Sequence, residues 1–180
     1  MYFAEENERL RKIVRRIAEG NPEKITSRPI DALLYSVVRA TNPERCLELG
    51  AFEGTTTLYI AQGLKDNEGG KLTSIEMNES NARGARQHLE DAEVDDYAEI
   101  IVGDSREIVP DLEGNFDLIF IDTSPNQYEE DYENATGLLA EGGILGIDDA
   151  LEGNDELIER IEDEMNIITF EDWSFVLAQK

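Results

Sequence analysis

One strand-turn-helix segment constrains the fold of this chain more than any other feature. Residues 46–56 (CLELGAFEGTT) contain an apolar run that ends at Gly50 and a helical pattern that Gly54 opens. A helix that begins at such a turn leaves its first backbone N–H groups free to meet a carboxylate or a phosphate, and Gly50 lets a ligand approach the backbone closely. Glu76 ends the next apolar run, where an acid can accept hydrogen bonds from two ribose hydroxyls. Together these features predict a site for an adenosine-containing cofactor.

The composition of the turn separates two kinds of cofactor. A dinucleotide fingerprint needs three glycines, whereas this turn offers Gly50 and Gly54 with a bulky and an acidic residue between them. A pyrophosphate would meet that acidic side chain. S-adenosylmethionine has no phosphate, carries a sulfonium cation, and presents a carboxylate that Thr55 or Thr56 could bind. The turn therefore favours S-adenosylmethionine over NAD; an ordinary strand-turn-helix without a ligand is the alternative.

The rest of the chain alternates between strand and helix patterns. Helical spacing covers residues 4–19, 29–40, 54–64, 79–91, 126–140 and 152–164, with a shorter segment at 105–112. Apolar runs that predict strands lie at 45–49, 71–76, 98–102, 116–122 and 143–148, and two more, at 167–170 and 174–178, flank a tight turn. The longer runs lack strict alternation, as expected of parallel strands buried on both faces. The predicted fold class is α/β: a doubly wound, mostly parallel, seven-stranded sheet with a C-terminal antiparallel hairpin.

The charge balance restricts the partners of the protein. The chain has 180 residues, with 41 Asp and Glu against 16 Lys and Arg, for a formal net charge of −25. The length predicts a single domain, with N-terminal helices over 1–40 and a cofactor-binding α/β core over 41–180. Diffuse acidity repels nucleic-acid phosphates and anionic membranes, and is typical of proteins from a high-salt cytoplasm. No apolar run has membrane-spanning length and no signal peptide is evident, so we expect a cytoplasmic protein without nucleic-acid or membrane partners.

The few soft ligands restrict metal chemistry. Cys46 is the single cysteine and His88 the single histidine, which excludes an internal disulfide and the usual cysteine- or histidine-rich metal centres. Any metal ion must then be held by oxygen.

With these residues in place, the chain resembles the class I S-adenosylmethionine-dependent O-methyltransferases of the catechol and caffeoyl-coenzyme-A group, from about residue 24 to residue 180. Residues 48–56 are similar to the first motif, residues 73–76 to the ribose-binding motif, and residues 103–105 to the adenine-binding turn. The resemblance implies a Rossmann-like methyltransferase fold and a cofactor site made of Glu48, Gly50, Ala51, Phe52, Gly54, Thr55, Thr56, Glu76, Met77, Gly103, Asp104, Ser105 and Asp122. For Asp104 and Ser105, capping of the short following helix is an equal alternative.

The same resemblance implies a metal site. Residues 120–122 and 142–149 are similar to the strand ends that supply metal ligands, which makes Asp122, Asp148 and Asp149 the expected ligands and Asp122 the expected catalytic residue. Three carboxylates that converge would repel one another without a cation, and Mg²⁺ or another hard divalent ion would remove that conflict. The alternative is that Asp122 faces the sulfonium while the other two cap the following loop.

Three departures from the family carry information. Pro125 stands where the family has a lysine that acts as general base, Asp149 stands where a ligating asparagine is usual, and the long insertion that covers the substrate is absent. Residues 24–28 occupy the place where relatives have a segment over the methionine end, with a plain loop as the alternative. We therefore expect an open acceptor pocket.

These observations predict methyl transfer from S-adenosylmethionine to an oxygen of a small-molecule acceptor, with assistance from a divalent metal as an open question and a homodimer as one assembly to test. Two alternatives remain. Pro125 suggests a protein that binds the cofactor without turnover, and Glu76 is compatible with an NAD-linked oxidoreductase.

Overall fold

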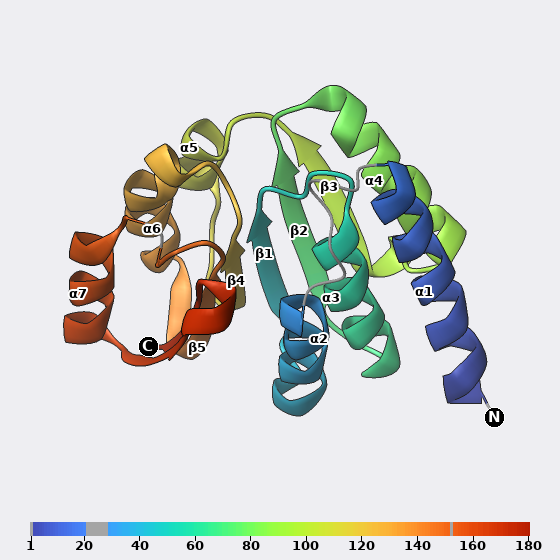
Figure 1. The fold of residues 1–180 in the computed structure, drawn as a ribbon, viewed down its shortest axis with the longest axis horizontal. Coiled ribbons are helices and arrows are strands. Elements are labelled where there is room, and N and C mark those ends of the chain that lie inside the picture. The colour runs from blue at the N-terminus through green and yellow to red at the C-terminus, as the bar shows by residue number, and fades with distance from the viewer. Residues whose placement is uncertain (1, 21–28, 152) are drawn as a thin grey trace.

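A seven-stranded sheet forms the centre of the molecule, in the order β3-β2-β1-β4-β5-β7-β6 (Figure 1). In this computed structural model, residues 2–20, 29–151 and 153–180 are described, so the segment 24–28 lies outside the described residues. The strands are β1 Arg45–Leu49, β2 Lys71–Glu76, β3 Ala98–Val102, β4 Phe116–Ile121, β5 Leu139–Ile147, β6 Asn166–Phe170 and β7 Phe175–Gln179. The first five are parallel, and β7 runs antiparallel to both β5 and β6. The predicted doubly wound sheet with a closing hairpin is confirmed.

Helices cover both faces of the sheet (Figure 1). One side carries α1 Tyr2–Gly20, α2 Pro29–Thr41, α3 Thr55–Asp66 and α4 Glu79–Ala92, and the other carries α5 Ser105–Ile108, α6 Tyr128–Thr136 and α7 Asp155–Glu164. Short 3₁₀ turns lie at Asp95–Tyr97, Val109–Asp111, Pro125–Gln127 and Glu171–Trp173. Among the described residues, no helix is both long and apolar enough to cross a membrane.

The continuous apolar run of β4 is explained by these two layers. Leu118 and Phe120 belong to the core cluster under α1 to α4, whereas Ile119 and Ile121 belong to the cluster under α6 and α7. Successive side chains of a strand point to opposite faces. Both faces are covered here, so neither set alternates with polar residues.

The segment 126–140 is where the expected elements differ most from the structure. The predicted helix ends early, at Thr136, because Leu139 already pairs with Phe116 at the start of β5. The register between β4 and β5 shifts after that pair, and Gly142 has a positive φ of 75°. Leu138 and Leu139 fit helical spacing, which is why the predicted helix was too long. In the structure, β5 begins before the glycine pair that follows and not after it.

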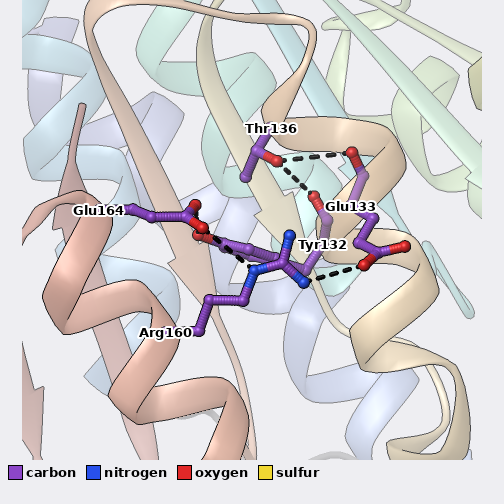
Figure 2. A network of polar contacts seen from close by, with 5 residues as sticks. All are labelled: Tyr132, Glu133, Thr136, Arg160 and Glu164. Atoms are coloured by element: carbon purple, nitrogen blue, oxygen red, sulfur yellow. Dashed lines mark hydrogen bonds and ion pairs between the residues drawn. The ribbon is translucent and has the colours of Figure 1, made fainter.

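A polar network joins α6 to α7 on the outer side of the sheet (Figure 2). The Tyr132 hydroxyl donates to Glu164 at 2.8 Å, and Arg160 contacts Glu164 at 3.1 Å and Glu133 at 2.9 Å. The Arg160 guanidinium also lies 5.2 Å from the Tyr132 ring centroid. Tyr132 is fully buried, so its ring belongs to the core while its hydroxyl bonds to Glu164, and it does not line the cavity described below. The network fixes α7 against the helix that follows β4.

Candidate functional site

A cavity of about 610 Å³ lies at the C-terminal ends of the parallel strands. This edge of an open α/β sheet is where ligands bind, and the volume suits a nucleoside-sized molecule. Its lining comes from loops after five strands and from the first turns of α2 and α3: Asp31, Gly50, Ala51, Phe52, Thr55, Thr56, Ile75, Glu76, Met77, Gly103, Asp104, Ser105, Asp122, Thr123, Ser124, Gln127 and Asp149. The structure thus brings together most of the residues singled out in the sequence.

The two glycines of the first turn are required by packing within the protein. Gly50 has a φ of 95°, and a Cβ added to it would lie 2.0 Å from the carbonyl oxygen of Asp122. Gly54 has a φ of 85°, and an added Cβ would lie 2.9 Å from the Cβ of Ala85 on α4. Gly50 still borders the cavity, whereas Gly54 does not. The close approach of the Asp122 backbone, more than the approach of a ligand, makes a glycine obligatory at position 50.

Glu76 is held in place by two loops. Its Oε2 accepts from the backbone N–H of Phe52 at 2.8 Å, and its Oε1 accepts from the backbone N–H of Asn78 at 2.8 Å. The side chain is buried yet borders the cavity. Oε1 also accepts from the Asn81 side-chain amide at 3.5 Å, whereas Oε2 keeps a further lone pair. The carboxylate is therefore oriented before any ligand arrives and can still accept hydrogen bonds from hydroxyls.

Glu48 lies beneath the cavity and does not border it. Its Oε2 accepts from the hydroxyls of Thr57 at 2.6 Å and Ser74 at 2.5 Å, and the residue is completely buried. The pKa of Glu48 is raised to about 7: burial is the main cause, the two hydroxyl hydrogen bonds oppose it, and the nearby charges of Asp122 and Asp31 add to it. The expectation that Glu48 contacts the cofactor directly is therefore not supported by its position. It belongs to the packing between β1, β2 and α3.

Asp31 is a cavity residue that the sequence analysis missed. It lies in the first turn of α2, is only 3% exposed, and accepts a hydrogen bond from the Thr56 hydroxyl at 2.8 Å. The sequence did contain a signal for it. Asp31 shares the helix face of Leu34 and Val38, both fully buried, and an acid on the apolar face of a helix is unusual unless it has a specific partner.

The loops after β3 and β4 are joined by Asp131 of α6. Its carboxylate accepts from the Ser105 hydroxyl and from the Thr123 hydroxyl, each at 2.7 Å, and is fully buried. Both hydroxyl residues border the cavity. Asp131 and Thr123 were also missed, because their role depends on a contact between loops that the sequence does not show.

Asp104 combines two expected roles. It accepts from the backbone N–H of Arg106 at 3.0 Å and so caps α5, and it also borders the cavity. Its carboxylate pairs with the Arg106 side chain, whose hydrogen bonds lower the pKa of Asp104. Met77, after β2, is 61% exposed and lies at the cavity edge, where it offers an apolar surface to a flat ring.

The expected metal site of three carboxylates is not assembled in the part of the chain that the structure describes. Asp122 and Asp149 border the cavity, but Asp148 is completely buried and does not. Asp149 adopts a left-handed conformation with a φ of 51°. Across residues 2–20, 29–151 and 153–180, no group of three Asp, Glu, His or Cys side chains is placed to hold a metal ion. Metal binding by Asp122, Asp148 and Asp149 therefore stays a prediction from the resemblance.

The described lining of the cavity has one sign of charge. It includes five acidic residues (Asp31, Glu76, Asp104, Asp122 and Asp149) and no Lys, Arg or His. Asp104 also pairs with Arg106, just outside the lining. Such a cavity favours cationic groups and disfavours phosphates.

Fold and cavity together define a class: a doubly wound α/β protein with its cavity at the strand ends and an oriented acid at the end of β2. The comparison with protein families narrows this class. The family described as the methyltransferase domain matches residues 47–150, more than half of the chain. The chain belongs to this methyltransferase domain family.

Curated relatives and solved structures agree with this assignment. The chain is 33% identical to catechol O-methyltransferase B of Danio rerio over 66% of this chain and 47% of the relative, and 31% identical to catechol O-methyltransferase of Mycobacterium tuberculosis over 67% and 54%. A caffeoyl-CoA O-methyltransferase of Stellaria longipes is 26% identical over 84% and 65%. The chain thus spans about half to two thirds of the length of these relatives.

The fold likeness extends over nearly the whole chain. An S-adenosylhomocysteine-bound methyltransferase of Podospora anserina superposes with a TM-score of 0.85 at 19% identity, covering 95% of this chain and 86% of that one. An O-methyltransferase of Streptomyces achromogenes, solved in complex with S-adenosylmethionine, gives a TM-score of 0.77 at 24% identity, covering 96% and 89%. At these identities the structures establish the shared fold.

Proposed function

We propose that the cavity binds S-adenosylmethionine and that the protein transfers its methyl group to an oxygen of a small-molecule acceptor. The carrying observation is the acidic cavity in which Glu76 is already oriented by backbone N–H groups of two loops. The names of the relatives, catechol and caffeoyl-CoA O-methyltransferases, support the reaction class. The S-adenosylmethionine and S-adenosylhomocysteine complexes of the similar folds support the cofactor.

The charge of the cavity supports this cofactor over a dinucleotide. S-adenosylmethionine brings a sulfonium and an ammonium cation, which acidic walls attract. NAD brings a pyrophosphate, and the described lining has no cationic side chain to neutralise it. Glu76, the feature that is compatible with an NAD-linked oxidoreductase, serves a ribose hydroxyl equally well in either cofactor.

Each wall of the cavity has a proposed role. Glu76 binds the ribose hydroxyls, and Met77 with the Gly103–Ser105 turn holds the adenine. Gly50, Ala51 and Phe52 form the floor beneath the sulfur. Asp122, at the end of β4, lies where a negative charge stabilises the sulfonium. All of these residues border the cavity.

The proposed reaction is an in-line displacement. The acceptor oxygen forms a bond to the methyl carbon, the carbon–sulfur bond breaks with its electron pair going to sulfur, and S-adenosylhomocysteine leaves. The protein contributes mainly alignment of the three atoms. Pro125 cannot accept the acceptor's proton, so Asp122 and Asp149 are the carboxylates at the cavity that remain for this role. The three-carboxylate site is not assembled among the described residues, and the proposed reaction contains no step through a metal ion.

The acceptor is expected to be neutral or cationic, because the acidic lining that disfavours a pyrophosphate also disfavours an anionic acceptor. The single domain of residues 1–180, a homodimer, the absence of nucleic-acid and membrane partners, and a cytoplasm of high salt stay predictions from the sequence.

Turnover is tested by incubating the protein with S-adenosylmethionine and a panel of small hydroxylated molecules and measuring S-adenosylhomocysteine formed. We expect product that depends on both the protein and an acceptor. Tight cofactor binding without product for any acceptor would instead favour the binding protein suggested by Pro125.

A further inference from the structure

Two threonine hydroxyls in the first turn of α3 donate hydrogen bonds to buried carboxylates. Thr56 Oγ1 donates to Asp31 Oδ1 at 2.8 Å, and Thr57 Oγ1 donates to Glu48 Oε2 at 2.6 Å. A hydroxyl has one proton and two lone pairs. While its proton is bound to Asp31, Thr56 can only accept a hydrogen bond from a molecule in the cavity. The expected role of Thr56, donating to a methionine carboxylate, requires the proton that Asp31 receives.

Asp31 adds a negative charge at the same point. Although only 3% of the residue is exposed, it borders the cavity beside Thr56. Its charge also acts on Tyr59 of α3. The pKa of Tyr59 is raised mainly by burial and, in addition, by the charge of Asp31. A carboxylate next to an accepting hydroxyl complements an ammonium group, which has three protons to donate and a positive charge. The same pair repels a carboxylate.

We propose that Asp31 and Thr56 together bind the ammonium of the ligand's amino-acid end, and that Asp31 makes this end of the cavity selective for an amine. The inference rests on the proposed function, in which that ligand is S-adenosylmethionine. The carboxylate of the ligand is left to Thr55, which also borders the cavity and whose buried hydroxyl has no hydrogen-bond partner among the described residues.

Three adenosine derivatives separate the two ends of the ligand. Methylthioadenosine has neither charged group, an aminopropylthio analogue keeps only the amine, and a carboxypropylthio analogue keeps only the carboxylate. Each is titrated by calorimetry into the wild-type protein and into Asp31→Asn, Thr56→Val and Asp163→Asn. Asn at position 31 keeps an oxygen that accepts from Thr56 and removes the charge. Asp163 is exposed on α7 and does not border the cavity, so its variant controls for the loss of one negative charge.

We expect the wild-type protein to bind the aminopropylthio analogue at least about tenfold more tightly than the carboxypropylthio analogue, the scale of a charged hydrogen bond. Asp31→Asn should remove this preference and leave methylthioadenosine binding unchanged. Thr56→Val should weaken the amine analogue alone, and Asp163→Asn should change nothing.

Two results would overturn the assignment. One is an unchanged preference for the amine in Asp31→Asn, and the other is a Thr56→Val variant that loses affinity for the carboxypropylthio analogue and keeps it for the amine, which would restore the donor role of Thr56. Failure of the wild-type protein to bind any of the three compounds, methylthioadenosine included, would overturn the proposed function itself.

Discussion

Glu48 belongs to the family motif, and its burial makes it a residue that affects the stability of the folded protein. The carboxyl group is completely buried between two hydroxyl donors, and its Oε1 has no hydrogen-bond partner among the described residues. Burial raises its pKa to about 7. Near neutral pH the folded protein therefore holds this group partly protonated, whereas the unfolded chain releases the proton at the ordinary pKa of a glutamate.

The stability of the protein should depend on pH through this group. A carboxyl whose pKa is raised in the folded state contributes stability that is present below the unfolded pKa of about 4.5 and is lost as the pH rises through about 7. Glu48→Gln imitates the protonated form. We expect the variant and the wild type to have similar unfolding free energies near pH 4.5, and the variant to be more stable by roughly 1–3 kcal/mol at pH 8.

Denaturant unfolding at several pH values measures this difference. Glu162→Gln, at an exposed position of α7, is the matched control and should show no such divergence. A difference between Glu48→Gln and the wild type that stays constant from pH 4.5 to pH 8 would contradict the raised pKa.

At the scale of elements, the sheet could be predicted because its strands are buried on both faces. Such strands leave continuous apolar runs in the sequence, and β3 and β1 begin and end at the predicted residues, 98–102 and 45–49. The boundary between α6 and β5 was predicted less well, since a pair of leucines fits helical spacing and strand pairing alike. The register shift in β5 belongs to its pairing with β4, and this pairing is what makes the segment a strand instead of a helix.

The candidate site was predictable where residues belong to one loop and unpredictable where they meet across loops. Gly50 and Glu76 follow directly from strand ends. Asp31, by contrast, reaches the cavity because α2 packs along α3. Asp148 and Asp149 are neighbours in the sequence, yet Asp148 is buried, whereas Asp149, in a left-handed conformation, borders the cavity.

For the whole molecule, the net charge of −25 makes electrostatic self-repulsion a term in the stability of the fold. Ion pairs oppose this repulsion at a few places, as where Arg9 and Arg16 of α1 contact Glu93 and Asp91 at the end of α4 at 2.6 Å and 2.5 Å. Exposed pairs of this kind contribute at most about 1 kcal/mol each. Salt weakens both the pairs and the repulsion, and because acidic residues are in excess, the repulsion outweighs the attraction of the pairs.

We therefore expect the melting temperature to rise as KCl is increased from dilute buffer to molar concentration, where the screening length falls from about 10 Å at 0.1 M to about 3 Å at 1 M. Thermal unfolding followed by circular dichroism measures this. A melting temperature that is flat or falls with KCl would contradict adaptation to high salt.

The most direct measurement of what the cavity binds is a calorimetric titration of the protein with S-adenosylhomocysteine, NAD and NADP, repeated with Glu76→Ala and with the exposed-site control Glu162→Ala. We predict saturable one-to-one binding of S-adenosylhomocysteine, no binding of either dinucleotide, and a loss of roughly 1–3 kcal/mol in Glu76→Ala alone, the scale of a charged hydrogen-bond acceptor. Binding of NAD or NADP with equal or greater affinity, or an affinity for S-adenosylhomocysteine that Glu76→Ala leaves unchanged, would contradict the proposed cofactor site.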